Sequence, residues 1–329
     1  MALIKCAGFD YLTTLAPASA LASLGFTNCT ILPGQGRAGG GCAKLGQINL
    51  PARLGTFYCG FAILNPSGVT INFNDSTKGT NFSLKFTSAG AITVTPQSSS
   101  NAVSSPPMAV IPGAVWQYLE VYGVIGSTGG AVTVRVNETV VLSLVSANTA
   151  SGSPTPSTGV DQLDFGSLGS AYVDDFYICD NSGASLNNFL GNTRVPAQTP
   201  NGVGASTQWT PTGSASYNWQ LASNPYMDDS SYVSCSTPGD IDLYTLSPVA
   251  NAPQIMAVQS IIVARQDDSG QRQVKSVIRS GSTQANGAVV NTNATYAGHT
   301  DIFTTDPNTG TGWTYAAVNA LQVGVDLVA

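Results

Sequence analysis

The sequence contains few charged residues. Asp, Glu, Lys and Arg make up 9% of its 329 residues, against roughly 25% in ordinary globular domains. The formal net charge of -6 comes from 12 cations and 18 anions, so no strong positive field draws in a phosphate backbone. We therefore expect no nucleic-acid partner, and neutral polar side chains must cover the surface.

Histidine and paired cysteine motifs are also scarce. His299 is the single histidine, and no G-x-S-x-G motif accompanies it, so we interpret it as a solvated loop residue rather than a catalytic base. The six cysteines form no C-x-x-C pair, which excludes the usual zinc spacing and favours buried free thiols. The sequence therefore predicts no catalytic residue and no enzyme activity.

Long apolar runs are missing as well. No segment approaches the ~18 consecutive apolar residues of a membrane-spanning helix, and the first ten residues lack the apolar run of a signal peptide. We expect a protein made in a cytoplasm, without membrane insertion.

What the sequence does contain is β-strand patterning. Apolar and polar residues alternate through Trp116–Val124 and Ala131–Leu144, and Gly129-Gly130 and Asn137-Glu138 are turn signals between them. The pattern predicts a meander of three antiparallel strands. Two further strands are expected at Val160–Gly166 and Ala171–Asp180.

The remaining segments predict a second β-rich region. The length exceeds that of most single cores, and the polar, Gly- and Pro-rich segment 182–222 is the expected junction. Beyond it, Ile255–Gln266 and Gln271–Arg279 on either side of the turn Asp267–Gly270 predict a long hairpin. The one helical pattern, Tyr11–Leu24, is interrupted by Pro17.

Pairs of acidic residues are the candidates for carboxylate chemistry. Consecutive residues on a strand point to opposite faces, so such pairs are poorly placed to flank one glycosidic bond. Asp240 and Asp242 share a face at a period of two, but they lie in the second half. The adjacent pairs are Asp174-Asp175, Asp228-Asp229 and Asp267-Asp268.

Three acidic residues near the end of one predicted strand are candidates for Ca²⁺ coordination, because hard cations take carboxylate oxygens from loops. They are Asp174, Asp175 and Asp180. The alternative is that they cap the strand, and the Asp-rich spacing of a dedicated calcium loop is missing. Calcium is thus the one candidate cofactor, and we expect the protein to have no cofactor.

Two sets of side chains are candidates for partner contacts. Four cations cluster on the predicted hairpin and form either a docking patch for an acidic partner or a solvated face. Three tryptophans are candidates for stacking on sugar rings or for core anchoring. The cations are Arg265, Arg272, Lys275 and Arg279, and the tryptophans are Trp209, Trp219 and Trp313.

The strand block Trp116–Leu144, followed by the closing strand Tyr172–Asp180, resembles the centre of a laminin G-like, concanavalin A-like domain. The resemblance implies an all-β fold. It would consist of a jelly-roll sandwich over residues 1–181, a linker and junction over 182–222, and a smaller β-rich domain over 223–329.

Shorter segments in order along the chain resemble structural proteins of tailed bacteriophages. They are Gly8–Asp10, Gly36–Gly40, Asn187–Val195, Ser206–Pro211, Ala264–Gly270, Ile278–Gly281 and Thr305–Gly310. The resemblance implies a virion structural protein made in the host cytoplasm, either a tail tip or tail fibre component or a capsid decoration, and it transfers no catalytic residues.

Three functions follow as hypotheses. The first is particle assembly or surface attachment by a homo-oligomer that contacts other virion proteins, since a charge-poor sandwich can associate through apolar and hydroxyl contacts. The second is a carbohydrate-binding module that recognises host surface glycans. The third is a polysaccharide hydrolase.

Overall fold

The computed structural model describes residues 3–12, 18–97, 101–111, 113–166, 169, 171–224, 227, 229–250, 252 and 254–329. The chain forms two compact units: unit 1 comprises Met1–Asp10 and Gly25–Pro196, and unit 2 comprises Tyr11–Leu24 and Ala197–Ala329. The expected junction 182–222 is thus divided, because its first part belongs to unit 1 and its second part to unit 2.

Unit 1 is a sandwich of two antiparallel sheets, with eight and seven strands in the described residues. Sheet A has the order β13 (Thr139–Ala147), β12 (Gly130–Val136), β11 (Gln117–Val124), β6 (Thr56–Leu64), β15 (Tyr172–Asp180), β4 (Cys42–Lys44) and β3 (Thr30–Leu32), with β1 (Leu3–Ala7) paired to β15. Sheet B has the order β10 (Val103–Ser104), β9 (Ile92–Pro96), β8 (Gly79–Phe86), β7 (Thr70–Asp75), β14 (Val160–Asp164), β5 (Gln47–Leu54) and β2 (Phe26–Thr27).

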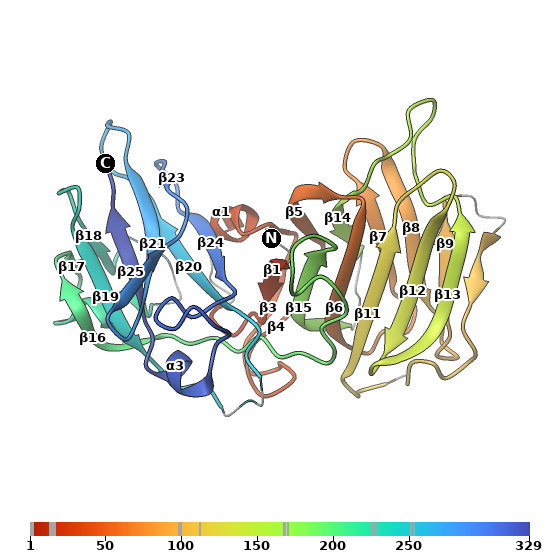
Figure 1. Cartoon of the computed structure of the whole chain (residues 1–329), viewed down its shortest axis with the longest axis horizontal. Coiled ribbons are helices and arrows are strands. Elements are labelled where there is room, and N and C mark those ends of the chain that lie inside the picture. The colour runs from red at the N-terminus through yellow and green to blue at the C-terminus, as the bar shows by residue number, and fades with distance from the viewer. Residues whose placement is uncertain are drawn as a thin grey trace. The chain divides into compact units, whose positions relative to one another are not determined.

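The chain passes repeatedly between these two sheets, which is the jelly-roll arrangement (Figure 1). The expected fold class is confirmed. The meander β11–β12–β13 is also confirmed, and its turn residues Asn137 and Glu138 both have positive φ, at 46° and 68°, as a tight two-residue hairpin requires.

Phenylalanines fill the space between the sheets of unit 1. Phe73 and Phe82 stack with ring centroids 4.4 Å apart, and Phe57 stacks on Phe73 at 5.6 Å. All three side chains are buried. Because alternate residues of each strand point inward, the opposite face of sheet A carries a separate set of side chains.

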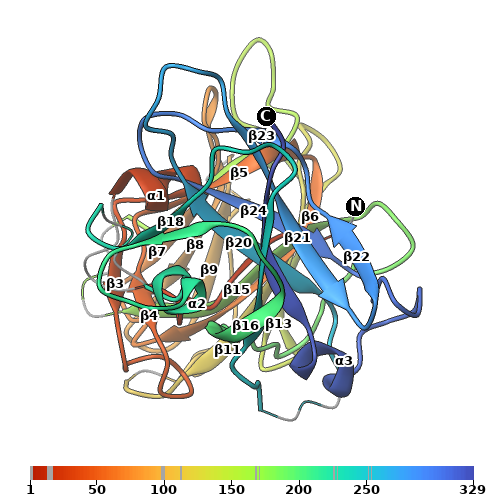
Figure 2. The same cartoon turned by 90° about the vertical axis from the view of Figure 1, so that its left-hand side faces the viewer.

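Unit 2 is smaller and also β-rich. Its main sheet, sheet C, has the order β16 (Pro200–Thr207), β19 (Ile241–Leu246), β25 (Gln322–Leu327), β21 (Gln273–Ser280) and β22 (Thr283–Asn286), with β23 (Val290–Asn291) paired to β21. Two strand pairs accompany it: β17 (Thr210–Thr212) with β18 (Tyr232–Ser234), and β20 (Val258–Ala264) with β24 (Ala297–Phe303). The helices are α1 (Ala18–Ser23), α2 (Asn218–Ala222) and α3 (Tyr315–Asn319), and α2 packs against β16 (Figure 2).

Two expectations for these segments are corrected. The hairpin of β20 with β21 does not form, because β20 pairs with β24 in one sheet and β21 pairs with the C-terminal strand β25 in another. The expected helix is shorter, six residues in α1, and Pro17 lies outside the described residues. No helix among the described residues is long and apolar enough to cross a membrane.

Candidate functional site

The outer face of sheet A carries tyrosines and charged groups. Strand register places Glu120 opposite Arg135 on one side and Gly60 on the other, and Gly60 is opposite Tyr177. Tyr118, two residues before Glu120, lies on the same face. A surface of this composition is a candidate binding face. A ligand can reach it only where no other segment of the chain lies on it.

The chain itself occupies this face. After β15, residues 188–195, here called the strap, run along the outer side of sheet A. Four backbone N–H groups of the strap donate hydrogen bonds to side chains of unit 1. They are Leu190 to Tyr177 Oη (3.0 Å), Gly191 to Glu120 Oε1 (2.8 Å), Asn192 to Glu138 Oε1 (3.1 Å) and Val195 to Asp175 Oδ1 (2.8 Å).

Glu120 is the centre of the contact between the strap and sheet A. Its side chain is fully buried, accepts a hydrogen bond from Tyr177 Oη at 2.7 Å and forms an ion pair with Arg135 at 3.2 Å. The guanidinium of Arg135 also lies 4.7 Å from the ring centroid of Phe189 in the strap. Burial, followed by the charge of Glu120, raises the pKa of Tyr177. At this point backbone N–H groups of the strap occupy acceptor atoms of Tyr177 and Glu120.

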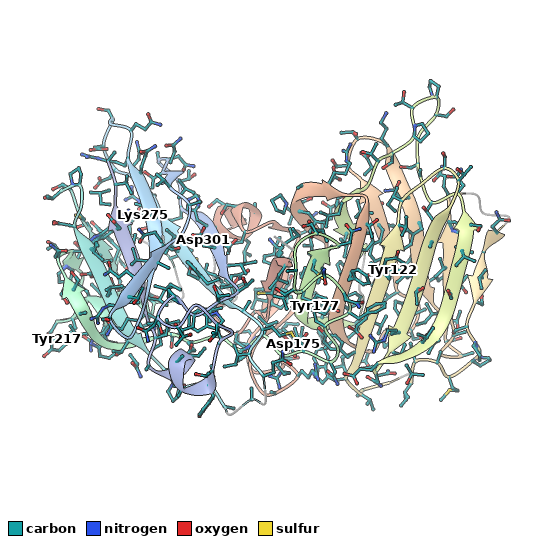
Figure 3. The ribbon with its side chains drawn as sticks, in the orientation of Figure 1. Tyr122, Asp175, Tyr177, Tyr217, Lys275 and Asp301 are labelled. Atoms are coloured by element: carbon teal, nitrogen blue, oxygen red, sulfur yellow. The ribbon has the colours of Figure 1, made fainter. Side chains whose placement is uncertain are left out.

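Asp175, labelled in Figure 3, lies beside the other end of the strap, where it accepts the backbone N–H of Val195. Asp175 forms ion pairs with Arg37 at 3.2 Å and with Arg194 at 2.9 Å. Asp174 accepts the backbone N–H of Arg37 at 2.8 Å, and burial, with the neighbouring Asp175 charge, raises its pKa to about 7. Both carboxylates are buried, so neither is open to a glycosidic bond.

Of the three calcium candidates, Asp174 and Asp175 lie together beside Arg37, whereas Asp180 has separate partners. Asp180 accepts hydrogen bonds from the backbone N–H and the hydroxyl of Ser182, at 2.9 and 2.7 Å, and so caps the end of β15. Among the described residues no group of three or more His, Cys, Asp or Glu side chains is arranged to hold a metal ion. The strand-capping alternative describes Asp180.

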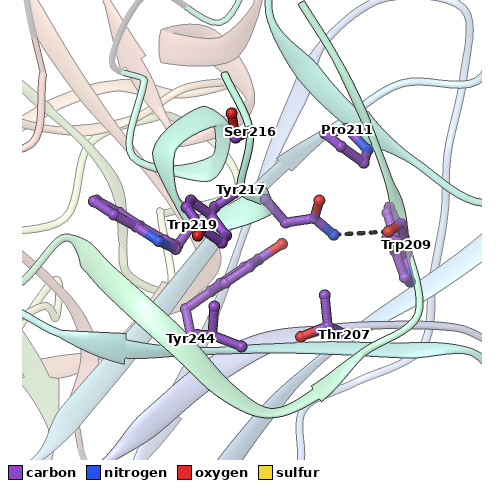
Figure 4. Close-up of a pocket in the computed structure, with 9 residues that line it drawn as sticks. Thr207, Trp209, Pro211, Ser216, Tyr217, Trp219 and Tyr244 are labelled. Atoms are coloured by element: carbon purple, nitrogen blue, oxygen red, sulfur yellow. Dashed lines mark hydrogen bonds between the residues drawn. The ribbon is translucent and has the colours of Figure 1, made fainter.

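A second candidate site, the aromatic pocket, is an open cavity of about 210 Å³ in unit 2 (Figure 4). Strand β16, the turn into β17, helix α2 and strand β19 supply its walls. Trp209 and Trp219 are half-buried, Tyr217 is 55% exposed, and Tyr244 lies buried at the base. The lining residues are Val203, Thr207, Trp209, Pro211, Ser216, Tyr217, Asn218, Trp219 and Tyr244.

One buried carboxylate connects the walls of the aromatic pocket. Asp242 accepts the backbone N–H of Gln208 at 2.8 Å and that of Trp209 at 3.3 Å with Oδ1. Its Oδ2 accepts Asn218 Nδ2 at 2.6 Å and Tyr244 Oη at 2.7 Å. Since these donors come from the β16–β17 turn, α2 and β19, Asp242 positions three separate elements around the cavity.

The ring of Trp209 is held in place from two sides. Its Nε1 donates to the backbone oxygen of Asp240 at 3.1 Å, and part of the ring packs against the buried cluster of Val274, Val325 and Leu327. Asn218 Nδ2 donates to the backbone oxygen of Trp209 at 2.7 Å. The aromatic surface that faces the cavity is therefore preorganised.

The structure separates the three tryptophan candidates. Trp209 and Trp219 line the same cavity, whereas Trp313 is 5% exposed and packs with Ile278, Val318 and Leu321 in a core cluster. Trp313 is therefore a core anchor and does not offer its ring to a sugar. Asn218 and Tyr244 carry no sequence signal of a binding role. They reach the cavity through contacts of helix α2 and strand β19 with other segments.

The four cations do not form a free docking patch, because three of them are neutralised locally. The ion pairs are Arg265 with Asp229 (2.8 Å), Arg272 with Asp268 (2.6 Å) and Lys275 with Asp326 (3.0 Å). Arg279 forms no ion pair with the described residues. The partner residue Asp228 of the expected Asp228-Asp229 pair lies outside the described residues.

His299 lies on strand β24 rather than in a loop, which corrects the expectation of a solvated side chain. It is half-buried, and its Nε2 is buried without a hydrogen-bond partner among the described residues. Burial lowers its pKa, an effect that the Asp301 charge opposes.

Among known proteins, similarity to this chain is found at the level of solved structures only. No protein-family model matches the chain, and no curated protein sequence matches it. A galectin of Caenorhabditis elegans is 14% identical, with 40% of this chain and 88% of the galectin covered and a TM-score of 0.29.

Two further solved structures are similar. An alginate lyase in complex with an alginate trisaccharide is 14% identical over 54% of this chain and 97% of the lyase, with a TM-score of 0.34. Domains LG4-5 of the mouse laminin α1 chain are 10% identical over 96% of this chain and 76% of theirs, with a TM-score of 0.29. These similarities assign no family and do not point to a phage origin.

Proposed function

We propose that this chain is a carbohydrate-binding protein and that the aromatic pocket of unit 2 is its ligand site. The observation that carries the proposal is the convergence of Trp209, Trp219, Tyr217 and Tyr244 on one open cavity. Large aromatic surfaces with a few fixed polar groups are typical of small-molecule sites. On the competing face of sheet A, Glu120 and Tyr177 already accept hydrogen bonds from the strap.

Recognition of a sugar ring follows from the chemistry of the walls. The C–H groups on one face of a pyranose pack against an aromatic ring, and the hydroxyls around its edge need hydrogen-bond partners. Hydroxyls of Thr207 and Ser216 line the same cavity and supply such partners. Because Trp209 is already fixed, little side-chain entropy is lost on binding.

The experiment is a glycan array with the full chain, followed by titration of the best oligosaccharide. We expect Trp219→Ala to weaken binding at least tenfold, since an aromatic anchor at a binding site contributes about 2 kcal/mol or more. Tyr315→Ala is the matched control, because Tyr315 is a 39% exposed aromatic side chain at the start of α3, outside the pocket lining. Equal affinities of the two variants would remove the pocket from the proposal.

Attachment to a surface through glycans is compatible with a role in a phage particle. That role, as a tail tip or fibre component or a capsid decoration, rests on the sequence resemblance and stays a prediction, as do the virion location and the homo-oligomer. Localising the chain in an image reconstruction of the particle and measuring its mass in solution test them. The predicted lack of hydrolase activity is tested by assaying polysaccharides for released reducing ends.

A further inference from the structure

We infer that the aromatic pocket selects a single uncharged sugar ring and disfavours acidic sugars. This inference rests on the proposed function and names its ligand class. The cavity, at about 210 Å³, lies below the roughly 300–1,000 Å³ of pockets that enclose drug-sized ligands. It therefore suits one ring at the end of a glycan rather than an extended run of rings.

The lining carries no compensating positive charge. None of the nine lining residues is Lys, Arg or His. A carboxylate or sulfate on a sugar would leave water on entering the cavity and would meet only hydroxyl, amide and aromatic groups. Burying an anion without a cationic partner is costly. An uncharged ring avoids this cost.

A negative charge lies directly behind the pocket. Asp242 is fully buried, and the groups that hydrogen-bond to it are neutral: two backbone amides, the Asn218 amide and the Tyr244 hydroxyl. No ion pair of the described residues neutralises it. Asp240 adds a second carboxylate, which accepts Gln208 Nε2 at 3.3 Å. Since charges interact more strongly in a low-dielectric interior, the buried Asp242 carboxylate repels an anion in the cavity.

The same carboxylate therefore has two effects. Its hydrogen bonds position the walls, and its charge sets the preference for neutral ligands. Asp242 acts on the ligand through Trp209, Asn218 and Tyr244 rather than by contact, so it is a positioning residue. The charge preference can be tested without touching it, by adding a cation at the rim.

The test compares neutral oligosaccharides ending in glucose, galactose, mannose or N-acetylglucosamine with acidic ones ending in uronate, sialate or a sulfated sugar. We expect the full chain to bind members of the neutral class, with affinity lost in Trp219→Ala. Stronger binding of the acidic class that is likewise lost in Trp219→Ala would overturn the selectivity and leave the proposed function standing. Binding of neither class would overturn the proposed function itself.

A rim variant tests the electrostatic cause. Val203 lines the pocket and is 51% exposed on β16, so Val203→Lys adds a cation without disturbing the core. We expect the ratio of acidic to neutral affinity to rise about tenfold, as one added charge at a few ångströms supplies. Val289→Lys, at a 49% exposed residue outside the lining, is the control. An unchanged ratio in Val203→Lys would overturn the electrostatic account.

Discussion

Replacing Tyr177 with Phe removes a single oxygen atom from the contact between the strap and sheet A. That oxygen donates to Glu120 Oε1 at 2.7 Å and accepts the backbone N–H of Leu190 at 3.0 Å. The ring of Tyr177 is 2% exposed and remains in the variant. The substitution therefore isolates the two hydrogen bonds from the packing.

The expected magnitude follows from the charge on one partner. A hydrogen bond to a charged group contributes about 1.5–3 kcal/mol and a neutral one about 0.5–1.5 kcal/mol. Loss of both predicts a decrease of about 2–4 kcal/mol in the free energy of unfolding of unit 1. For a unit of this size, about 3 kcal/mol corresponds to a decrease of roughly 6–12 °C in Tm.

Chemical unfolding measures this loss, and amide hydrogen exchange locates it. We expect faster exchange at Leu190 and Gly191, because the strap loses an anchor. Tyr122→Phe is the control: its ring packs 4.8 Å from that of Tyr58, and its hydroxyl makes no hydrogen bond to the described residues. If both variants lose the same stability and Leu190 exchanges at the wild-type rate, the strap is not held as described.

Three further predictions concern single residues. In Asp174→Asn the pH dependence of stability should change: burial raises the folded pKa to about 7 from 3.8, so the wild type loses stability as pH rises from 4 to 8. Between pH 4 and pH 8 the free energy of unfolding of the variant should therefore rise, relative to that of the wild type, by up to about 4 kcal/mol. Parallel pH–stability curves for the two proteins would contradict the raised pKa. Tyr244→Phe removes the 2.7 Å bond to Asp242 and should cost about 1.5–3 kcal/mol by denaturant unfolding, whereas an unchanged midpoint would refute the role of Asp242. Gly60→Ala would place a methyl carbon 2.3 Å from Tyr177 Cε1 and should cost about 1–3 kcal/mol, which a wild-type Tm would disprove.

Local patterning predicted the meander β11–β12–β13 and the strands β14 and β15 of unit 1, because turn residues bound these alternating segments. The Asn137-Glu138 turn and the alternation on either side of it specify the meander without distant information. The strap was not predicted. Its Phe189 and Arg194 side chains contact partners distant in sequence, and four of its other contacts are made by backbone N–H groups. Those groups leave no mark in the side-chain sequence.

In unit 2 the local sequence pattern predicted a wrong strand pairing. The turn Asp267–Gly270 and two apolar runs predict a hairpin, but β21 pairs with β25 at the end of the chain. Buried partners at large sequence separation outweigh a local turn signal. His299 was misplaced for the same reason, since its strand partner Ile262 is distant in sequence.

The aromatic pocket was predictable in part. Two of its tryptophans were candidates from residue type alone, but their convergence with Asn218 and Tyr244 depends on Asp242 joining three elements. Residue type could not distinguish Trp313, which is equally aromatic and lies in a core.

The most direct test of the proposed site is an NMR titration of the full chain with the best neutral oligosaccharide, following the indole N–H signals. We expect the signals of Trp209 and Trp219, which line the cavity, to shift with increasing ligand. The signal of Trp313, which is buried in the core, should stay in place. Unchanged Trp209 and Trp219 signals at saturating ligand would contradict the assignment of the aromatic pocket as the ligand site.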